Sequence, residues 1–171
     1  MSKDIQIFAY GVDIDYGRTL LSFPEAAVTA TAWLKDHELA FWDNGGATIR
    51  PCKGAEVQGI ILSVPKEFEA DLDDIKYYPS LKKKKTVTVE DTLTGKPMQA
   101  TVYYTEECYL SPFPPSAERF GRMVDGYWRQ GLDTKPLFHA LTKANEDLIR
   151  MHNRQIQKPA HRSGKPKGRD R

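Results

Sequence analysis

The sequence has 171 residues, of which 40% are hydrophobic and 28% are charged, and its formal net charge is +2. This length is that of one domain, and the composition is that of a globular protein with its own core. No apolar stretch approaches the ~20 residues of a transmembrane helix, and no secretory signal pattern opens the chain. We therefore expect an intracellular, cytoplasmic protein that has no membrane partner.

The residue types that commonly form metal, redox or phosphate sites lack the spacing for them. Cys52 and Cys108 form no Cys-x-x-Cys pair, so two free thiols are the default expectation. The four histidines form no His-Glu-x-x-His or related metal motif, and neither a phosphate-binding loop nor a Gly-x-Ser-x-Gly motif occurs. The sequence predicts no metal site and no cofactor.

The first half of the chain has the pattern of short strands separated by turns. Apolar and β-branched residues indicate strands at residues 5–10, 26–33, 38–42, 47–50 and 56–64. A turn with weak helical spacing after it is expected at 13–21, and Asn44-Gly45-Gly46 is a strong turn signal. Gly59, inside the most apolar strand, indicates a bulge or a close approach of another backbone.

The second half begins with a short helix at 67–75, which carries Phe68, Leu72 and Ile75 on one face. Next come an antiparallel hairpin formed by 82–90 and 97–104, a rigid loop at 112–116, and helices at 118–130 and 135–151. Gly131 closes the first of these helices. This order favours an α+β fold with mostly antiparallel strands and helices packed around them.

Charge is distributed unevenly along the chain. Residues 150–171 carry a net charge of +7, whereas residues 1–149 carry −5. Because Ala160 is the single apolar residue after Lys158, this segment cannot bury surface and is expected to be disordered. We therefore predict a domain at 1–150 and a basic, disordered tail at 151–171. The tail is a candidate contact for nucleic acid or another acidic partner, as are the four lysines at 82–85, which could also protect a strand edge.

Four segments, in order, are similar to motifs of the γ-glutamylcyclotransferase-like superfamily. Phe8-Ala9-Tyr10-Gly11 resembles the opening [F/Y]-x-Y-G-[S/T] loop, and residues 44–49 resemble a Gly-rich strand entry. Residues 57–73 resemble a V-x-G strand followed by an L-D-x-x-E motif, and residues 125–132 resemble a late G-A-x-x-x-G-L segment. The resemblance covers about residues 5–143. It implies a small mixed β-barrel with flanking helices.

The resemblance also implies a site and a reaction. The opening loop would use its backbone N–H groups and its tyrosine to hold the α-carboxylate of a γ-glutamyl substrate. A glutamate in the L-D-x-x-E motif would move the proton while the α-amine attacks the γ-carbonyl and 5-oxoproline is released. The expected ligand is thus a small molecule with a carboxylate or γ-glutamyl group. In this sequence the loop consists of Ile7, Phe8, Ala9, Tyr10, Gly11 and Val12.

The sequence departs from this pattern at the positions that matter for catalysis. Val12 replaces a hydroxyl residue, and Asp13 replaces the asparagine after it. The position of the catalytic glutamate falls on Lys76, and that of the following glycine on Tyr77. A lysine near its reference pKa of ~10.4 is not a base at neutral pH unless burial lowers that pKa. Asp73, on nearly the same helical face, is the candidate substitute, and Lys76 could also be a solvated charge at a helix end.

Three functions stay open on this basis. The first is a cyclotransferase with an altered catalytic residue, which releases 5-oxoproline from γ-glutamyl amines or peptides. The second is a catalytically inactive family member that binds an anionic small molecule in the retained pocket, as Lys76 and Val12 favour. The third is an interaction protein that acts through its surface and its basic tail.

Overall fold

Five strands close into a barrel in the order β1–β3–β2–β4–β5. The structure is a computed structural model that describes residues 3–15, 17–42, 45–106 and 111–157. Neighbouring strands are antiparallel except where β1 and β5 run parallel and close the barrel. The fold is therefore α+β with a mixed barrel, as predicted. The strands are β1 (Ile5–Ala9), β2 (Ala27–Trp42), β3 (Gly46–Val64), β4 (Lys83–Asp91) and β5 (Pro97–Tyr104).

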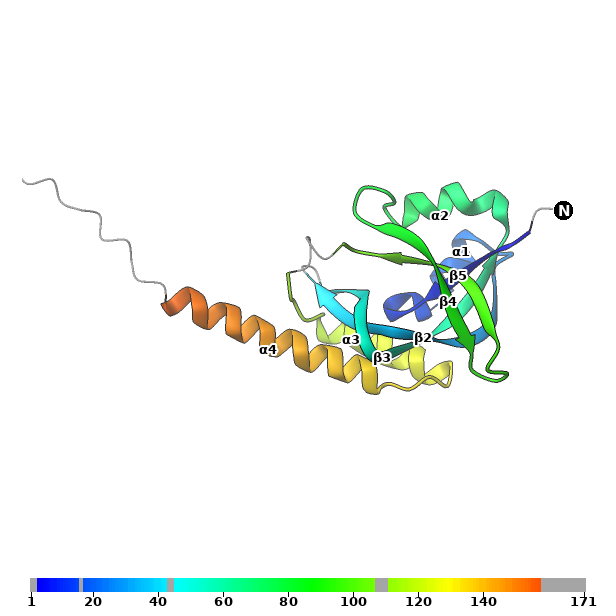
Figure 1. Cartoon of the computed structure of the whole chain (residues 1–171). Helices are drawn as coiled ribbons and strands as arrows, with labels where there is room; N and C mark the ends of the chain where they lie inside the picture. Colours follow the sequence, from blue (N-terminus) through cyan, green and yellow to red (C-terminus); the bar gives the residue numbers. More distant parts are fainter. Residues whose placement is uncertain (1–2, 16, 43–44, 107–110, 158–171) are drawn as a thin grey trace, which may run out of the picture.

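Helices cover both ends of the barrel (Figure 1). The helix α2 lies across one end, near β4 and β5, whereas α3 and α4 lie on the opposite side. The first part of α4 contacts β2, and the helix then continues beyond the barrel. The helical segments are η1 (Gly11–Ile14), α1 (Gly17–Ser22), η2 (Lys66–Phe68), α2 (Glu69–Ile75), α3 (Ala117–Arg129) and α4 (Lys135–Gln157).

Two long strands replace four of the predicted short ones. Residues 26–33 and 38–42 belong to the single strand β2, and residues 47–50 and 56–64 belong to β3. Polar residues interrupt the apolar pattern of the sequence at this point. The hydrogen-bond ladder between β2 and β3 nevertheless continues past them, with a register shift between Lys35 and His37. Asp36 lies there with φ 57°, and its carboxylate accepts the N–H of Gly54 from β3 at 3.0 Å. A bulge thus carries the pairing across a segment whose side chains are too polar to indicate a strand.

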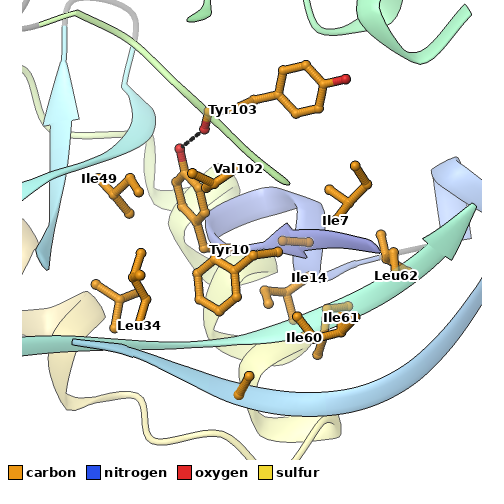
Figure 2. Close-up of a cluster of buried hydrophobic side chains, with 14 of the residues drawn as sticks. Ile7, Tyr10, Ile14, Leu34, Ile49, Ile60, Ile61, Leu62, Val102 and Tyr103 are labelled. Atoms are coloured by element: carbon orange, nitrogen blue, oxygen red, sulfur yellow. Dashed lines mark hydrogen bonds between the residues drawn. The ribbon is translucent and has the colours of Figure 1, made fainter. Parts of the chain in front are cut away.

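The core lies inside the barrel and under the helices. Every residue from Val57 to Val64 is buried, because one face of β3 points into the barrel and helices cover the other. Figure 2 shows apolar side chains of β1, β2, β3 and η1 gathered around Tyr10. An added Cβ at Gly59 would lie 2.6 Å from the Phe8 ring and closer still to the carbonyl oxygen of Ala9. The predicted close approach at Gly59 is therefore confirmed.

The C-terminal elements follow the predictions with one extension. The hairpin pairs Lys83 with Tyr104 and ends at the expected turn. Ser116 caps α3 by accepting the N–H of Arg119 at 3.2 Å. The helix α4 runs to Gln157 rather than ending at 151, since residues 151–157 contain no helix breaker. The tail predicted as disordered at 151–171 is therefore helical in its first part, 151–157, and its remainder lies outside the described residues, as do Asn44 and Cys108. Cys52 is a free thiol.

Candidate functional site

A cavity of about 590 Å³ opens between the loop after β1, the helix α2 and the first turn of α3. This volume is within the range of pockets that bind small organic ligands. The end of β2 and the start of β3 complete its wall through Trp42, Gly46 and Ala47. Its polar and charged lining residues include Tyr10, Asp13, Asp15, Lys76, Lys82 and Arg119.

Two buried tyrosines fix the loop after β1. Gly11 has φ 63°, and an added Cβ there would lie 2.7 Å from the Cβ of Ala47, so the position accepts no side chain. The N–H of Gly11 donates to the hydroxyl of Tyr127 on α3 at 3.1 Å. The hydroxyl of Tyr10 donates to the backbone carbonyl of Tyr103 at 2.5 Å (Figure 2). The hydroxyl of Tyr10 and the backbone N–H of Gly11 therefore tie the loop to β5 and to α3.

Lys76 lies at the position where the resemblance expects a glutamate, and it forms an ion pair. It is the residue that caps the C-terminus of α2, and its Nζ donates to Oδ2 of Asp13 at 2.5 Å. The Lys76 side chain is 15% exposed and the Asp13 side chain 38% exposed. Two residues that depart from the superfamily pattern thus contact each other across the cavity wall.

Three cations surround the carboxylate of Asp13. Burial alone would raise the pKa of this carboxyl, but Lys76, Lys82 and further away Arg119 together hold the pKa below its ordinary value. Burial lowers the pKa of Lys82, since a desolvated ammonium is disfavoured; the Asp13 carboxylate opposes this effect, whereas Lys76 and Arg119 act with it. The lining thus carries three cations, Lys76, Lys82 and Arg119, against the two carboxylates of Asp13 and Asp15.

Trp42 lines the cavity, but its indole N–H does not reach the cavity surface. The Nε1 atom is buried and has no hydrogen-bond partner among the residues that the structure describes. Trp42 therefore contributes apolar wall and no donor for a ligand.

Asp73 is engaged away from Lys76. Its carboxylate accepts hydrogen bonds from Nζ of Lys84 at 2.8 and 2.9 Å, and from the hydroxyl of Tyr103 at 2.5 Å. Lys84 also contacts Glu69 at 3.2 Å. Burial, and then the Asp73 carboxylate, raise the pKa of Tyr103. Asp73 thus connects α2 to the β4–β5 hairpin, and it does not line the large cavity.

The predicted substrate loop divides between two spaces. Tyr10 and Val12 line the large cavity. Ile7, Phe8 and Ala9 are buried in β1 and line a small cavity of about 20 Å³ that shares Tyr10, Asp13 and Lys76 with the large one. Gly11 is buried between them.

Several cavity residues are not indicated as site residues by the sequence, among them Asp15, Trp42, Lys82 and Arg119. Lys82 belongs to the run of four lysines for which the sequence predicts a contact with an acidic partner or protection of a strand edge, yet it precedes β4 and lines the cavity. The sequence does hold a hint, because Lys82 comes before the first residue of the strand, and its side chain need not be as exposed as the lysines inside the strand. Arg119 and Trp42 carry no motif, and only the closure of the barrel brings them to the cavity.

The described part of the chain lacks two kinds of feature, a metal-binding cluster and a membrane-spanning helix. No group of three or more His, Cys, Asp or Glu side chains among these residues could hold a metal ion. Within the same residues, no helix is both long and apolar enough to cross a membrane.

Comparison with known proteins identifies the family. The sequence model described as "Gamma-glutamyl cyclotransferase, AIG2-like" matches residues 7–130. The chain belongs to this family. The matched region includes the loop after β1, α2 with Lys76, and Arg119 on α3, so every cavity element of this γ-glutamyl cyclotransferase family member lies inside it. A search of curated proteins finds no match.

Solved structures share the fold. An uncharacterised protein from Homo sapiens is 25% identical, with a TM-score of 0.72, over 81% of this chain and 86% of that one. A protein named gamma-glutamyl cyclotransferase is 24% identical, with a TM-score of 0.70, over 95% and 93% of the two chains. A glutathione-specific gamma-glutamyl cyclotransferase from yeast is 12% identical, with a TM-score of 0.61, over 85% and 97%. The barrel and its helices are therefore those of the γ-glutamyl cyclotransferase fold.

Proposed function

We propose that this member of the γ-glutamyl cyclotransferase family binds a small anionic molecule, with a carboxylate or a similar oxygen-rich group, in the large cavity. The observation that carries the proposal is the Lys76–Asp13 ion pair, in which Lys76 stands where the resemblance expects the proton-shuttling glutamate. A cation there reverses the local charge. It therefore favours retention of an anion over general base catalysis.

The other carboxylates near the site support the same conclusion. Asp13 is held ionised by its cationic neighbours, and a carboxylate with a lowered pKa is a weak base. Asp73 is occupied by Lys84 and Tyr103. Neither residue is well placed to take a proton from the α-amine of a γ-glutamyl group.

Lys82 supplies the interaction that an anion would need. It lines the cavity, and Lys76 rather than Lys82 makes the close contact with Asp13. An anion beside Lys82 would relieve the penalty that burial and neighbouring cations place on its ammonium group.

Ligand-induced stabilisation tests this proposal. The wild-type protein is heated with acetate, glutarate, N-acetylglutamate and phosphate, each at increasing concentration. A ligand at 100 times its Kd stabilises by about 2.7 kcal/mol, which for a domain of this size raises Tm by roughly 5–10 °C. We expect at least one carboxylate to do so with a saturable dependence. If none of these anions changes Tm, the proposal is wrong.

A second candidate function is cyclotransfer with an amine as the base. The lowered pKa of Lys82 favours it, because such a lysine is neutral more often at physiological pH. The test is the release of 5-oxoproline from γ-glutamyl dipeptides and γ-glutamyl amines. We expect no product from the wild type. Product that disappears in Lys82→Gln would establish the second function instead, whereas product gained in Lys76→Glu would show that the pocket still accepts the family substrate.

A further inference from the structure

The mouth of the cavity carries apolar side chains that none of the described helices and strands covers. They lie in the rim turn, defined here as residues 75–82, which begins at the last residue of α2. Ile75, Tyr77 and Leu81 line the cavity, yet their exposed fractions are 51%, 63% and 56%. Large apolar side chains that are exposed together at a cavity mouth are typical of a binding surface rather than of a solvated face.

The rim turn joins this apolar surface to the cation. The carbonyl oxygen of Tyr77 accepts the N–H of Leu81 at 2.9 Å and the N–H of Lys82 at 3.2 Å. It also accepts the hydroxyl of Ser80 at 3.2 Å. One compact turn therefore holds an exposed leucine and a cavity lysine at adjacent positions.

The backbone of Tyr77 has a conformation that glycine, which has no Cβ, adopts more readily. Its φ is 57°, in the left-handed region where glycine is at home and bulky residues are uncommon. This is the usual conformation after a helix C-cap, since the N–H of Tyr77 donates to the carbonyl of Asp74 and the N–H of Tyr78 to that of Asp73. Glycine is the common residue at this position, yet here a tyrosine side chain stands largely exposed at the cavity mouth.

We infer that the ligand of this cavity is an amphipathic anion, whose charged head lies near Lys82 and whose alkyl or aryl group packs on Tyr77 and Leu81 of the rim turn. The inference rests on the proposed anion-binding function and names its ligand class. The head lies beside Lys82, where Lys76 and Arg119 add to the positive potential. The apolar group extends toward the mouth and covers side chains that now face solvent.

Matched ligands separate the two parts of this arrangement. Calorimetric titration compares acetate, hexanoate and 1-hexanol, which provide the head alone, both parts, and the apolar part alone. Partial burial of four added methylene groups should make hexanoate bind roughly tenfold more tightly than acetate. We expect 1-hexanol to bind at least tenfold more weakly than hexanoate. Equal binding of hexanoate and 1-hexanol would overturn the inference.

Variants locate the apolar contact. Tyr77→Gly should fold, because glycine adopts this φ without strain, and should bring the hexanoate-to-acetate affinity ratio to within about twofold. Leu81→Ser is the second variant and should lower the same ratio. Leu93→Ser is the matched control, since Leu93 is 93% exposed in the β4–β5 turn, and it should leave the ratio unchanged. A ratio that survives in both Tyr77→Gly and Leu81→Ser would overturn the inference.

The outcomes distinguish the inference from the function on which it rests. If acetate and hexanoate bind with the same affinity, the anion site stands and the amphipathic ligand is wrong. If neither acid binds but glutarate, N-acetylglutamate or phosphate does, the inference is wrong and the anion site stands. If no anion binds, the proposed function and the inference are both wrong.

Discussion

Replacement of Asp13 by asparagine removes the carboxylate that lies among the cavity cations. Exposed ion pairs contribute about 0.2–1 kcal/mol, whereas breaking a buried pair costs about 3–5 kcal/mol. The Lys76 side chain is mostly buried and that of Asp13 is more exposed, so this pair lies between the two limits. We expect Asp13→Asn to lower the free energy of unfolding by about 2 kcal/mol.

The reverse replacement should cost less. Lys76→Met leaves Asp13 with Lys82 and Arg119 nearby, so its charge stays partly compensated. Asp13→Asn instead leaves three cations without their carboxylate. We expect Lys76→Met to cost about 1 kcal/mol or less, and the double variant to be more stable than Asp13→Asn alone.

Urea unfolding of the two single variants and the double variant measures these differences through a double-mutant cycle. A cost of 2 kcal/mol corresponds to a fall in Tm of roughly 4–8 °C for a domain of this size. Asp13→Asn should also bind carboxylates about fivefold more tightly, since one repelling charge is gone. The reasoning is refuted if Lys76→Met is the more destabilising change, or if Asp13→Asn weakens anion binding.

Three other predictions concern the scaffold of the site. Gly59→Ala should lower the free energy of unfolding by about 3 kcal/mol or more in a denaturant titration, because the new Cβ would overlap the backbone of β1. The control is Gly121→Ala, which lies in open space on α3 and should be neutral or stabilising by up to about 1 kcal/mol. Tyr127→Phe removes the acceptor of the Gly11 N–H and should cost about 1–3 kcal/mol in the same assay; no cost would mean that this bond does not hold the loop. The lowered pKa of Asp13 stabilises the folded state above the ordinary carboxyl pKa of ~3.9, so this contribution should disappear as pH falls below that value. The loss of stability between pH 4 and lower pH should be smaller in Asp13→Asn than in the wild type, and equal losses would contradict the assignment.

The fold could be predicted from local patterns because its strands and helices are strongly periodic. The hairpin at β4–β5 and the close approach at Gly59 follow from turn residues and from one glycine in an apolar run. The lengths of β2 and β3 could not be predicted in the same way. Their polar middle segments pair through a bulge at Asp36, and a bulge depends on the partner strand rather than on the local sequence.

The site was harder to predict because its contacts are distant in sequence. Motif position alone identified Lys76 as a departure, but its partner Asp13 lies 63 residues away. Nothing in the run of four lysines distinguishes Lys82, which lines the cavity, from its neighbours. Trp42 and Arg119 reach the cavity only because the barrel closes and α3 packs against η1.

The most direct test of the account is a calorimetric titration of glutarate into the wild type, Lys82→Gln and Lys96→Gln. Lys82 lines the cavity, whereas Lys96 is an exposed lysine next to the β4–β5 turn and serves as the matched control. Loss of a charge-assisted hydrogen bond should weaken binding by at least about tenfold in Lys82→Gln and leave Lys96→Gln like the wild type. Identical binding by all three proteins, or no binding by any of them, would contradict the assignment of the cavity as an anion site.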